Sequence, residues 1–228
     1  MRDSISCIIP AYNEGPRIWT VLKVALSSKQ VNQVITINDG SSDNTLSEMK
    51  KFSKNNKLKI IHIDKNSGKS FAFAKGLAFA KGNIILMLDS DLRGLNGSNI
   101  KSLTQPLLNG EADMTLSLRE NSARAYKLLG IDFVSGERAF KKNILGNTSE
   151  IRMLERYGLE AFINDKFIRT GGKLKVVKWS NVSITRKTEK IGLLRGYIGE
   201  IRMVSQIIRA QGLWGVVSQL ISLKKLKY

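Results

Sequence analysis

Acidic residues follow two apolar runs in the first half of the chain, and their spacing suits metal and phosphate chemistry. Asp89 and Asp91 come directly after the run that ends at Leu88, and Asp39 follows the expected strand Val34–Asn38. Two carboxylates at i and i+2 beyond a strand can turn toward one cation, and hard divalent ions take oxygen ligands together with substrate phosphates. Ligands of open α/β sheets bind where strands end. The pattern therefore predicts a metal–diphosphate site.

The stretch Gly68-Lys69-Ser70 is typical of the end of a phosphate-binding P-loop. That loop needs an earlier glycine five positions before the second one, because its backbone N–H groups must wrap the phosphates. Ile63 stands at that position. A nucleotide must therefore be held in another way, and Lys69 is the cation available at the start of the expected helix.

Short apolar runs alternate with helical stretches, and these elements must position the acidic residues. Runs rich in Ile or Val predict strands at Ile5–Ile9, Val34–Asn38, Leu58–Ile63 and Asn83–Leu88. The helices expected between them run from Gly15 to about Ser27, from a cap at Ser42 or Asp43, and over Gly68–Lys81 between a Ser67 cap and Gly82. This alternation favours an α/β fold with a mostly parallel sheet and helices on both faces.

The pattern loosens after Arg93, and no repeat or linker indicates a second globular domain. The expected elements are a helix at Ser98–Leu108 that ends or breaks near Pro106, a strand at Asp113–Leu118, helices at Ser122–Leu129 and Ile151–Arg169, and a strand at Lys173–Trp179. From Gly192 onward, apolar residues recur every three or four positions, which predicts a basic amphipathic helix broken near Gly212 or Gly215.

Composition limits the partners of the chain. The 228 residues carry 37 Lys and Arg against 19 Asp and Glu, a net charge of +18 that attracts nucleic acid, anionic lipid or phosphorylated substrates. The single cysteine, Cys7, lies in an apolar run, cannot form an internal disulfide and fits a reducing compartment. The N-terminus does not resemble a signal peptide, and no apolar window reaches the length of a spanning helix. We therefore expect a cytoplasmic protein.

Six ordered motifs resemble the family 2 glycosyltransferases of the GT-A fold. Three lie in the first half, "IIPAYNEG", "INDGSSDNT" and "GKSFAFAKGLAFAKGNIILMLDSDL". Three later ones, "DFVSGERAF", "YGLEAFIND" and "KLKVVKWSNVSITRK", resemble segments of polyprenyl-phosphate sugar synthases and of enzymes like glucosyl-3-phosphoglycerate synthase. The resemblance spans residues 4–190, and implies a GT-A domain over 1–190 with a mixed, mostly parallel sheet, followed by a helical tail over 191–228.

The resemblance also implies a reaction and a donor site. A hexose would move from a UDP- or GDP-linked donor to a hydroxyl or phosphate of a phosphorylated or lipid acceptor, such as a polyprenyl phosphate, with inversion. The implied donor-binding residues are Pro10, Ala11, Tyr12, Glu14, Asp39, Gly40, Lys69, Asp89 and Asp91. Lys69 would meet the diphosphate or the base. Asp89 and Asp91 would contact ribose and a Mg²⁺ or Mn²⁺ ion, with Asp91 the more direct ligand.

The resemblance assigns acceptor chemistry to the second half. Glu160 stands where related inverting enzymes place a catalytic base, and Asp165, on a different helical face, is the second choice. Arg138 and Arg186 match positions that bind phosphate in polyprenyl-phosphate enzymes. Arg138 could equally satisfy Glu137 or a helix end.

The sequence departs from the family pattern at two places. Asn38 stands where the family usually has Asp, and no metal-binding His lies near residues 184–185. The sole histidine, His62, falls inside an expected strand, so we interpret it as a packed or edge residue. Metal coordination by the chain is therefore expected to be incomplete.

Two other functions and two roles for the tail stay open. A nucleic-acid-binding protein would explain the charge, but acids at three strand ends would repel a phosphate backbone, so nucleic acid is not the expected partner. A non-catalytic nucleotide-sugar sensor would keep the same site. The tail either packs on the domain or on another subunit, or lies on an anionic membrane, which the terminal Lys224, Lys225 and Lys227 favour. The oligomeric state is left open.

Overall fold

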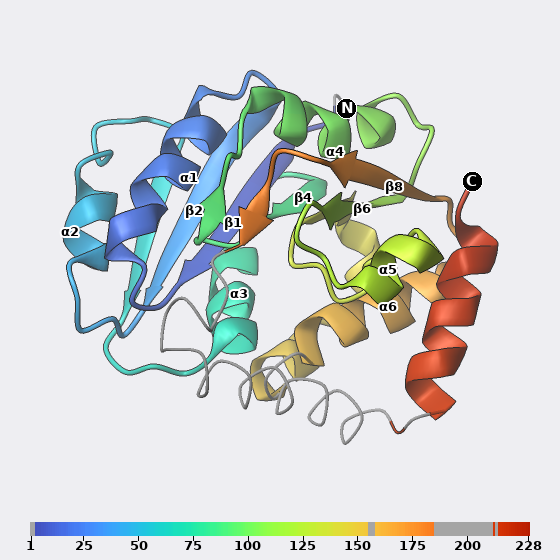
Figure 1. Ribbon diagram of the computed structural model, residues 1–228. Helices are drawn as coiled ribbons and strands as arrows, with labels where there is room; N and C mark the ends of the chain where they lie inside the picture. The colour runs from blue at the N-terminus through green and yellow to red at the C-terminus, as the bar shows by residue number, and fades with distance from the viewer. Residues whose placement is uncertain (1–2, 155–157, 185–211, 213) are drawn as a thin grey trace.

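The computed structural model describes residues 3–154, 158–184, 212 and 214–228 (Figure 1). Seven strands form one mixed sheet in the order β3-β2-β1-β4-β7-β6-β8. Their bounds are β1 (Ile5–Ala11), β2 (Val31–Asp39), β3 (Leu58–Ile63), β4 (Ile84–Met87), β6 (Met114–Arg119), β7 (Arg138–Lys141) and β8 (Leu174–Trp179). A small second sheet pairs β5 (Leu92–Arg93) with β9 (Ser183–Ile184). The expected α/β fold with a mostly parallel sheet is confirmed.

The helices cover both faces of the large sheet (Figure 1). They are α1 (Gly15–Ser27), α2 (Thr45–Lys50), α3 (Lys69–Leu77), α4 (Gly97–Leu108), α5 (Arg124–Leu129) and α6 (Gly158–Thr170), with 3₁₀ turns at Lys142–Leu145 and Ser149–Met153. One apolar core lies under α1 and α4, and the other lies under α3 and α6. Ile8 enters one core while Cys7 and Ile9 enter the other, so this strand is buried on both faces.

The strand order places the ends of β1 and β4 at a reversal point. β1 pairs in parallel with β2 on one side and with β4 on the other. The connection that follows β1 therefore runs to one side of the sheet, and the connection that follows β4 runs to the other side. Such a reversal opens a crevice at the carboxyl ends of the strands. The acidic residues after β2 and β4 therefore lie at the edge of the sheet where the fold supplies a binding site.

Several element boundaries differ from expectation. The helix that contains Lys69 ends at Leu77, short of Lys81, and Gly68 precedes it without a side-chain cap from Ser67. Helix α4 continues through Pro106 to Leu108. Pro106 lies in the last turn of the helix, and its missing backbone N–H removes only one hydrogen bond there. The helix expected over Ile151–Arg169 is divided into a 3₁₀ turn and α6.

Strand β7 was not expected from the sequence. It runs antiparallel to both of its neighbours, β4 and β6, and Arg138, Ala139 and Phe140 are fully buried. The run is four residues long and carries charges at both ends, so it lacks the pattern of a strand. Its position in mid-sheet brings the segment 132–138 behind the ends of β4 and β6.

The C-terminal helix, residues 214–226, packs against the domain (Figure 1, red). Leu223 is fully buried in the core under α6, and Lys227 forms a parallel bridge with Leu174 of β8. Gly215 lies inside this helix, so the helix is not broken there. The rest of the expected tail, residues 191–211 and 213, lies outside the described residues. The packed alternative therefore applies to the end of the chain.

Among the helices of the described residues, none combines the length and the hydrophobicity that crossing a bilayer requires.

Candidate functional site

The loops that follow β1 and β2 are joined by hydrogen bonds to backbone groups. The Asn13 side-chain oxygen accepts from the Ser42 N–H at 2.9 Å. The Asp43 carboxylate accepts from the N–H groups of Gly15 and Thr45, each at 3.0 Å, and so supports the starts of α1 and α2. The N-cap position of α2 is Asn44, so Asp43 is not the N-cap that the sequence predicted, although it binds the first N–H group of each helix. These bonds hold two loops of the binding edge in one arrangement.

A pocket of about 240 Å³ lies at this edge of the sheet. Its lining residues are Pro10, Ala11, Tyr12, Glu14, Asp39, Lys69, Asp89, Ser90 and Asp91. The structure therefore brings eight of the nine expected donor-binding residues into one pocket. It adds Ser90, which lies between Asp89 and Asp91 and was not predicted from the sequence. We call these nine residues the donor wall.

Gly40 is the expected donor-binding residue that does not line the pocket. Its backbone has a φ of +65°, and a Cβ added there would lie 2.4 Å from the Asn66 nitrogen. The residue thus allows a tight turn to pass close to the backbone of residues 65–66. Its role in this structure is conformational.

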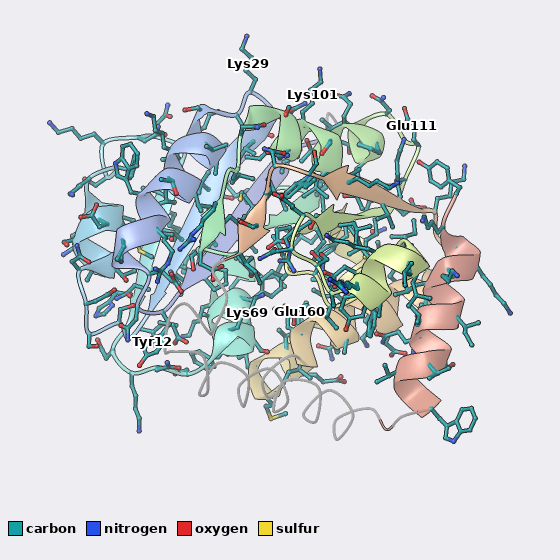
Figure 2. The ribbon with its side chains drawn as sticks, viewed as in Figure 1. Tyr12, Lys29, Lys69, Lys101, Glu111 and Glu160 are labelled. Atoms are coloured by element: carbon teal, nitrogen blue, oxygen red, sulfur yellow. The ribbon has the colours of Figure 1, made fainter. Side chains whose placement is uncertain are left out.

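Two donor-wall residues expected near the base and ribose differ in exposure. Tyr12 is 46% exposed, at the outer side of the pocket (Figure 2). Glu14 is buried, and its Oε2 lies 2.5 Å from the Arg17 Nε. The Glu14 carboxylate is therefore neutralised within the protein, whereas the Tyr12 ring offers a surface to a ligand.

Asp39 is held by backbone groups at the start of α3. Its two carboxylate oxygens accept from the N–H groups of Ser67, at 2.9 Å, and Gly68, at 2.8 Å. A carboxylate has about four acceptor positions, so these bonds leave capacity for a ligand donor. The same bonds fix the backbone that precedes Lys69, and Asp39 thereby helps to place the lysine.

Lys69 joins the donor wall to the candidate base. Its Nζ lies 2.6 Å from the Asp89 Oδ1 and 2.7 Å from the Glu160 Oε1 (Figure 2). Asp89 follows β4, Glu160 lies in the first turn of α6, and Lys69 begins α3, so three elements meet at one ammonium group. The other Glu160 oxygen, Oε2, is buried and has no partner among the described residues. The expected base thus lies beside the pocket.

The charges at this junction shift the pKa values of the groups. Burial disfavours the charged form of Asp89, but the Lys69 ammonium and the more distant Arg119 outweigh it, lowering the Asp89 pKa to about 2. For Lys69 burial also opposes the charge, and the two carboxylates raise its pKa well above the ordinary value. The Lys69 ammonium and the Asp89 carboxylate thus stabilise each other's charged forms.

A second group of polar side chains lies behind Asp89, and we call it the rear cluster. It consists of Ser117, Arg119, Asp132, Ser135 and Glu137, all buried. The Arg119 Nη1 lies 2.8 Å from the Glu137 Oε2, and the hydroxyls of Ser117 and Ser135 donate to the same oxygen at 3.0 and 2.9 Å. Burial and the nearby Asp89 raise the Glu137 pKa to about 7, against the opposing effect of Arg119.

Gly136 brings the rear cluster into contact with Asp89. A Cβ added at Gly136 would lie 2.4 Å and 2.5 Å from the two Asp89 carboxylate oxygens. Only a residue without a side chain lets this loop approach so closely. The position of the Asp89 carboxylate is thus limited on one side by a glycine and on the other by Lys69.

Arg138 does not occupy the acceptor-binding position that the resemblance implied. It is fully buried, and its guanidinium donates to the carbonyls of Phe133, Ser135 and Glu160 and to the Asn164 side chain. These bonds tie the loop before β7 to α6. Arg138 is therefore a structural residue that holds the helix bearing Glu160. This is close to the alternative role considered for it, in which it satisfies Glu137 or a helix end.

Asp165, the second choice for the base, does not line the pocket. The Asp165 carboxylate is half exposed and pairs with Arg169 at 2.9 Å along the surface of α6. Arg186 lies outside the described residues. Ile184 pairs with Leu92, the residue after Asp91, so β9 leads the chain toward the position where some relatives carry a metal-binding histidine.

Asn38, which departs from the family pattern, contacts the sole histidine, His62. The Asn38 Nδ2 and the His62 Nδ1 are 2.8 Å apart, and His62 lies on β3, the edge strand of the large sheet. The histidine is therefore an edge residue, as expected, and its partner is the asparagine that replaces the usual aspartate.

The donor set suits a metal ion that a substrate helps to hold. In the described part of the chain, no group of three His, Cys, Asp or Glu side chains could hold a metal ion without other ligands. The pocket lining nevertheless carries four carboxylates, on Glu14, Asp39, Asp89 and Asp91, and one ammonium, on Lys69. Mg²⁺-type sites commonly use one or two carboxylates plus substrate phosphates and water. Asp91 and Asp89 fit that arrangement.

A larger cavity of about 710 Å³ lies between α1 and residues 92–97. Its lining shares no residue with that of the smaller pocket. It contains none of the expected catalytic or donor-binding residues, so the chemistry is assigned to the smaller pocket.

The fold and the pocket define an α/β protein with an acidic site at the reversal point of its sheet. Comparison with known proteins identifies the group: the sequence pattern of glycosyl transferase family 2 matches residues 6–160, more than half of the chain. The chain therefore belongs to glycosyltransferase family 2.

Individual relatives match over part of their length. An uncharacterized glycosyltransferase of Synechocystis sp. is 33% identical over 98 residues, covering 41% of this chain and 31% of that protein. The poly-beta-1,6-N-acetyl-D-glucosamine synthase of Staphylococcus epidermidis is 34% identical over 90 residues, 39% of this chain and 22% of that protein. The dodecaprenyl-phosphate galacturonate synthase of Rhizobium johnstonii is 28% identical over 123 residues, 51% and 36% of the two chains. The matches thus span about a third of these relatives or less.

Solved structures share the fold. Glucosyl-3-phosphoglycerate synthase from Mycobacterium tuberculosis in complex with phosphoglyceric acid superposes with a TM-score of 0.71 at 22% identity, over 96% of this chain and 80% of that one. The same enzyme with Mn²⁺, UDP-glucose and phosphoglyceric acid gives a TM-score of 0.70 at 21% identity, with the same coverage. At this identity the likeness establishes the GT-A type of fold.

Proposed function

We propose that this chain transfers a hexose from a UDP- or GDP-linked sugar to a hydroxyl or phosphate oxygen of an acceptor, with inversion and with the help of a divalent ion. The observation that carries the proposal is the Lys69 ammonium, which lies between Asp89 of the donor wall and Glu160. It links the expected site of the leaving diphosphate to the expected base.

The charge of the pocket supports the divalent ion. A donor diphosphate would enter a lining with four carboxylates and one ammonium, and like charges repel strongly where water is partly excluded. Asp91 and Asp89 would hold Mg²⁺ or Mn²⁺. When bound, the ion supplies Lewis-acid neutralisation of the diphosphate. The pocket is smaller than the roughly 300–1,000 Å³ common for ligand sites, so part of the donor would lie outside it.

Glu160 would take the proton when the acceptor is a hydroxyl. The acceptor oxygen bonds to the anomeric carbon, the bond from that carbon to the diphosphate oxygen breaks, and the proton passes to Glu160. A positioned base of this kind contributes about 10²–10⁴-fold in rate. Its unpartnered Oε2 is the atom available for the proton, because Oε1 already contacts Lys69. A phosphate acceptor is already ionised and would need Glu160 only for orientation.

A phosphorylated or lipid acceptor is supported by charge and by the relatives. The net charge of +18 favours anionic partners. One relative is named for dodecaprenyl phosphate, and one structural neighbour binds phosphoglyceric acid. Peripheral contact with an anionic membrane belongs to the same proposal, since a polyprenyl phosphate would be presented there.

Product formation tests the proposal. Purified protein is incubated with UDP- and GDP-sugars, Mn²⁺ or Mg²⁺, and either polyprenyl phosphates or phosphoglyceric acid, and the products are followed by mass spectrometry. We expect metal-dependent release of the nucleoside diphosphate together with a glycosylated acceptor. Saturable donor binding without any release would instead support the non-catalytic sensor, and tighter, salt-dependent binding to random DNA would support the nucleic-acid alternative.

A further inference from the structure

The C-terminal helix, residues 214–226, uses one face to pack on the domain. Leu223 is fully buried, and Val216 and Leu220 pack against the same core. The Gln219 side chain donates to the Ala161 carbonyl at 3.0 Å and accepts from an α6 side chain at the same distance. This inner face is therefore fixed to the helix that carries Glu160.

The opposite face of the helix carries a second set of apolar residues, which we call the outer stripe. Trp214 is 86% exposed, Val217 is 42% exposed and Ile221 is 50% exposed. At 100° per residue, Ile221 lies about 40° and Trp214 about 60° around the helix from Val217. Lys224 and Lys225 are both exposed. On the same scale, Lys224 lies about 20° beyond Val217 and Lys225 about 20° beyond Trp214. The outer stripe is thus narrow, apolar and bordered by cations.

We propose that the outer stripe docks on the surface of an anionic membrane, with the apolar side chains at the level of the acyl boundary and the lysines among the headgroups. An interfacial helix needs an apolar face with Trp or Leu-type residues and basic residues beside it, and anionic lipid adds electrostatic attraction. The net charge of +18 acts in the same direction. Packing of the inner face leaves these three apolar side chains of the helix for the contact.

A second copy of the chain fits the outer stripe less well. A stable interface buries about 800 Å² on each partner, whereas one large side chain supplies on the order of 200 Å². Self-association there would also place Lys224 and Lys225 of two strongly cationic chains against each other. Area and charge both favour the lipid surface.

Docking through the outer stripe would fix the orientation of the site relative to the membrane. Gln219 of the inner face contacts the backbone of Ala161, the residue after Glu160. The membrane contact and the candidate base are therefore held on one packed pair of helices. The membrane docking does not depend on the proposed function. Only the use of this orientation to reach a lipid acceptor rests on it.

Vesicle sedimentation with the full chain tests the docking. Vesicles of phosphatidylcholine alone are compared with vesicles that also contain phosphatidylglycerol, for the unchanged protein, for Ile221→Asp and for Ser218→Asp. Both variants add one carboxylate to an exposed turn of the same helix, but only Ile221 lies in the outer stripe. We expect Ile221→Asp to weaken binding to the anionic vesicles about tenfold and Ser218→Asp about twofold at most.

Equal weakening by the two variants would overturn the proposal, because it would show attraction by overall charge alone. Failure of the unchanged protein to sediment with anionic vesicles would do the same. A change in oligomeric state on Ile221→Asp, measured by analytical ultracentrifugation without lipid, would assign the stripe to a second copy. Melting temperature and nucleoside diphosphate binding are measured on each variant, so that loss of folding or of the donor site is separated from loss of docking.

Discussion

The donor wall and the rear cluster both surround Asp89, yet they hold their carboxylates in different ways. On the donor wall, Asp39 accepts from the backbone N–H groups of Ser67 and Gly68, in the loop after β3. In the rear cluster, Glu137 is held by the side chains of Arg119 and Ser117 on β6 and of Ser135 in its own loop. A backbone N–H is present at every residue except proline, whereas a side-chain partner requires a particular residue at a particular position.

The difference has an energetic side. Buried ion pairs gain little net stability, since desolvation offsets their attraction, but loss of one partner leaves an uncompensated charge. The rear cluster is of this kind, and the Arg119 Nε and Asp132 Oδ1 lack partners among the described residues. We interpret the rear cluster as a rigid support for Asp89, and the donor wall as the surface that meets the ligand.

The largest expected effect comes from Glu160, which connects the two regions through Lys69. Glu160→Gln should lower kcat with a hydroxyl acceptor about 10²–10⁴-fold while leaving donor affinity within about threefold, because a base acts mainly in the transition state. Steady-state kinetics checks this. Asp165→Asn is the matched control on the same helix and should leave kcat unchanged; a larger loss there would move the base to Asp165.

Lys69→Met removes the ammonium that joins the donor wall to Glu160. The change leaves the Asp89 and Glu160 carboxylates unpaired, so kcat/KM should fall on the order of 100-fold. Lys75→Met, farther along α3 and remote from these carboxylates, provides the control. Equal kinetics for the two variants would show that the junction at Lys69 has no part in the reaction.

Gly136→Ala asks whether the rear cluster positions Asp89. The added methyl group would overlap the Asp89 carboxylate, a side-chain end that can move, so donor affinity should fall about tenfold while stability changes by about 1 kcal/mol or less. Gly97→Ala adds the same group where nothing lies within 4 Å. Calorimetric titration and thermal unfolding measure the two effects, and an unchanged donor affinity would separate the rear cluster from the site.

The smallest effect concerns the charge of Glu137. Its pKa rises from 4.5 to about 7 on folding, so its stabilising contribution is complete below pH 4.5 and is lost as the pH rises through 7. In metal-free buffer, the free energy of unfolding should therefore decrease by on the order of 2 kcal/mol between pH 5 and 8. Glu137→Gln should flatten this dependence in urea titrations. A slope that persists in the variant would place the titrating group elsewhere.

The sequence could indicate the pocket because its residues lie at the ends of recognisable strands. Ala11 and Asp39 are the last residues of β1 and β2, and Asp89 and Asp91 follow β4. The first four strands pair in parallel, so their carboxyl ends meet at one edge. Gly40 does not line the pocket, since a glycine after a strand can serve the turn itself. Donor binding by these residues stays a prediction.

The rear cluster escaped prediction for identifiable reasons. Arg119 is the last residue of β6. The rule that polar residues at strand ends lie at the binding edge was used for Asp39 and Asp89. It would also have identified Arg119 if it had been applied to this strand. Glu137 lies just before β7, a strand too short and too charged to recognise. Arg138 was assigned to phosphate from the family resemblance, and its carbonyl partners are set by tertiary packing, which the sequence does not display.

The most direct test of the proposed metal–diphosphate site is a calorimetric titration of UDP or GDP, whichever the unchanged protein binds. One titration is carried out with Mn²⁺ and a separate one with EDTA. The account predicts that Asp91→Asn loses the metal-dependent affinity, on the order of 100-fold, while keeping its melting temperature without ligand. Glu111→Gln, outside the pocket lining and paired with Lys175 on the surface, should behave as the unchanged protein does. Equal metal-dependent affinity of Asp91→Asn and the unchanged protein would contradict the claim that these carboxylates bind a nucleoside diphosphate through a divalent ion.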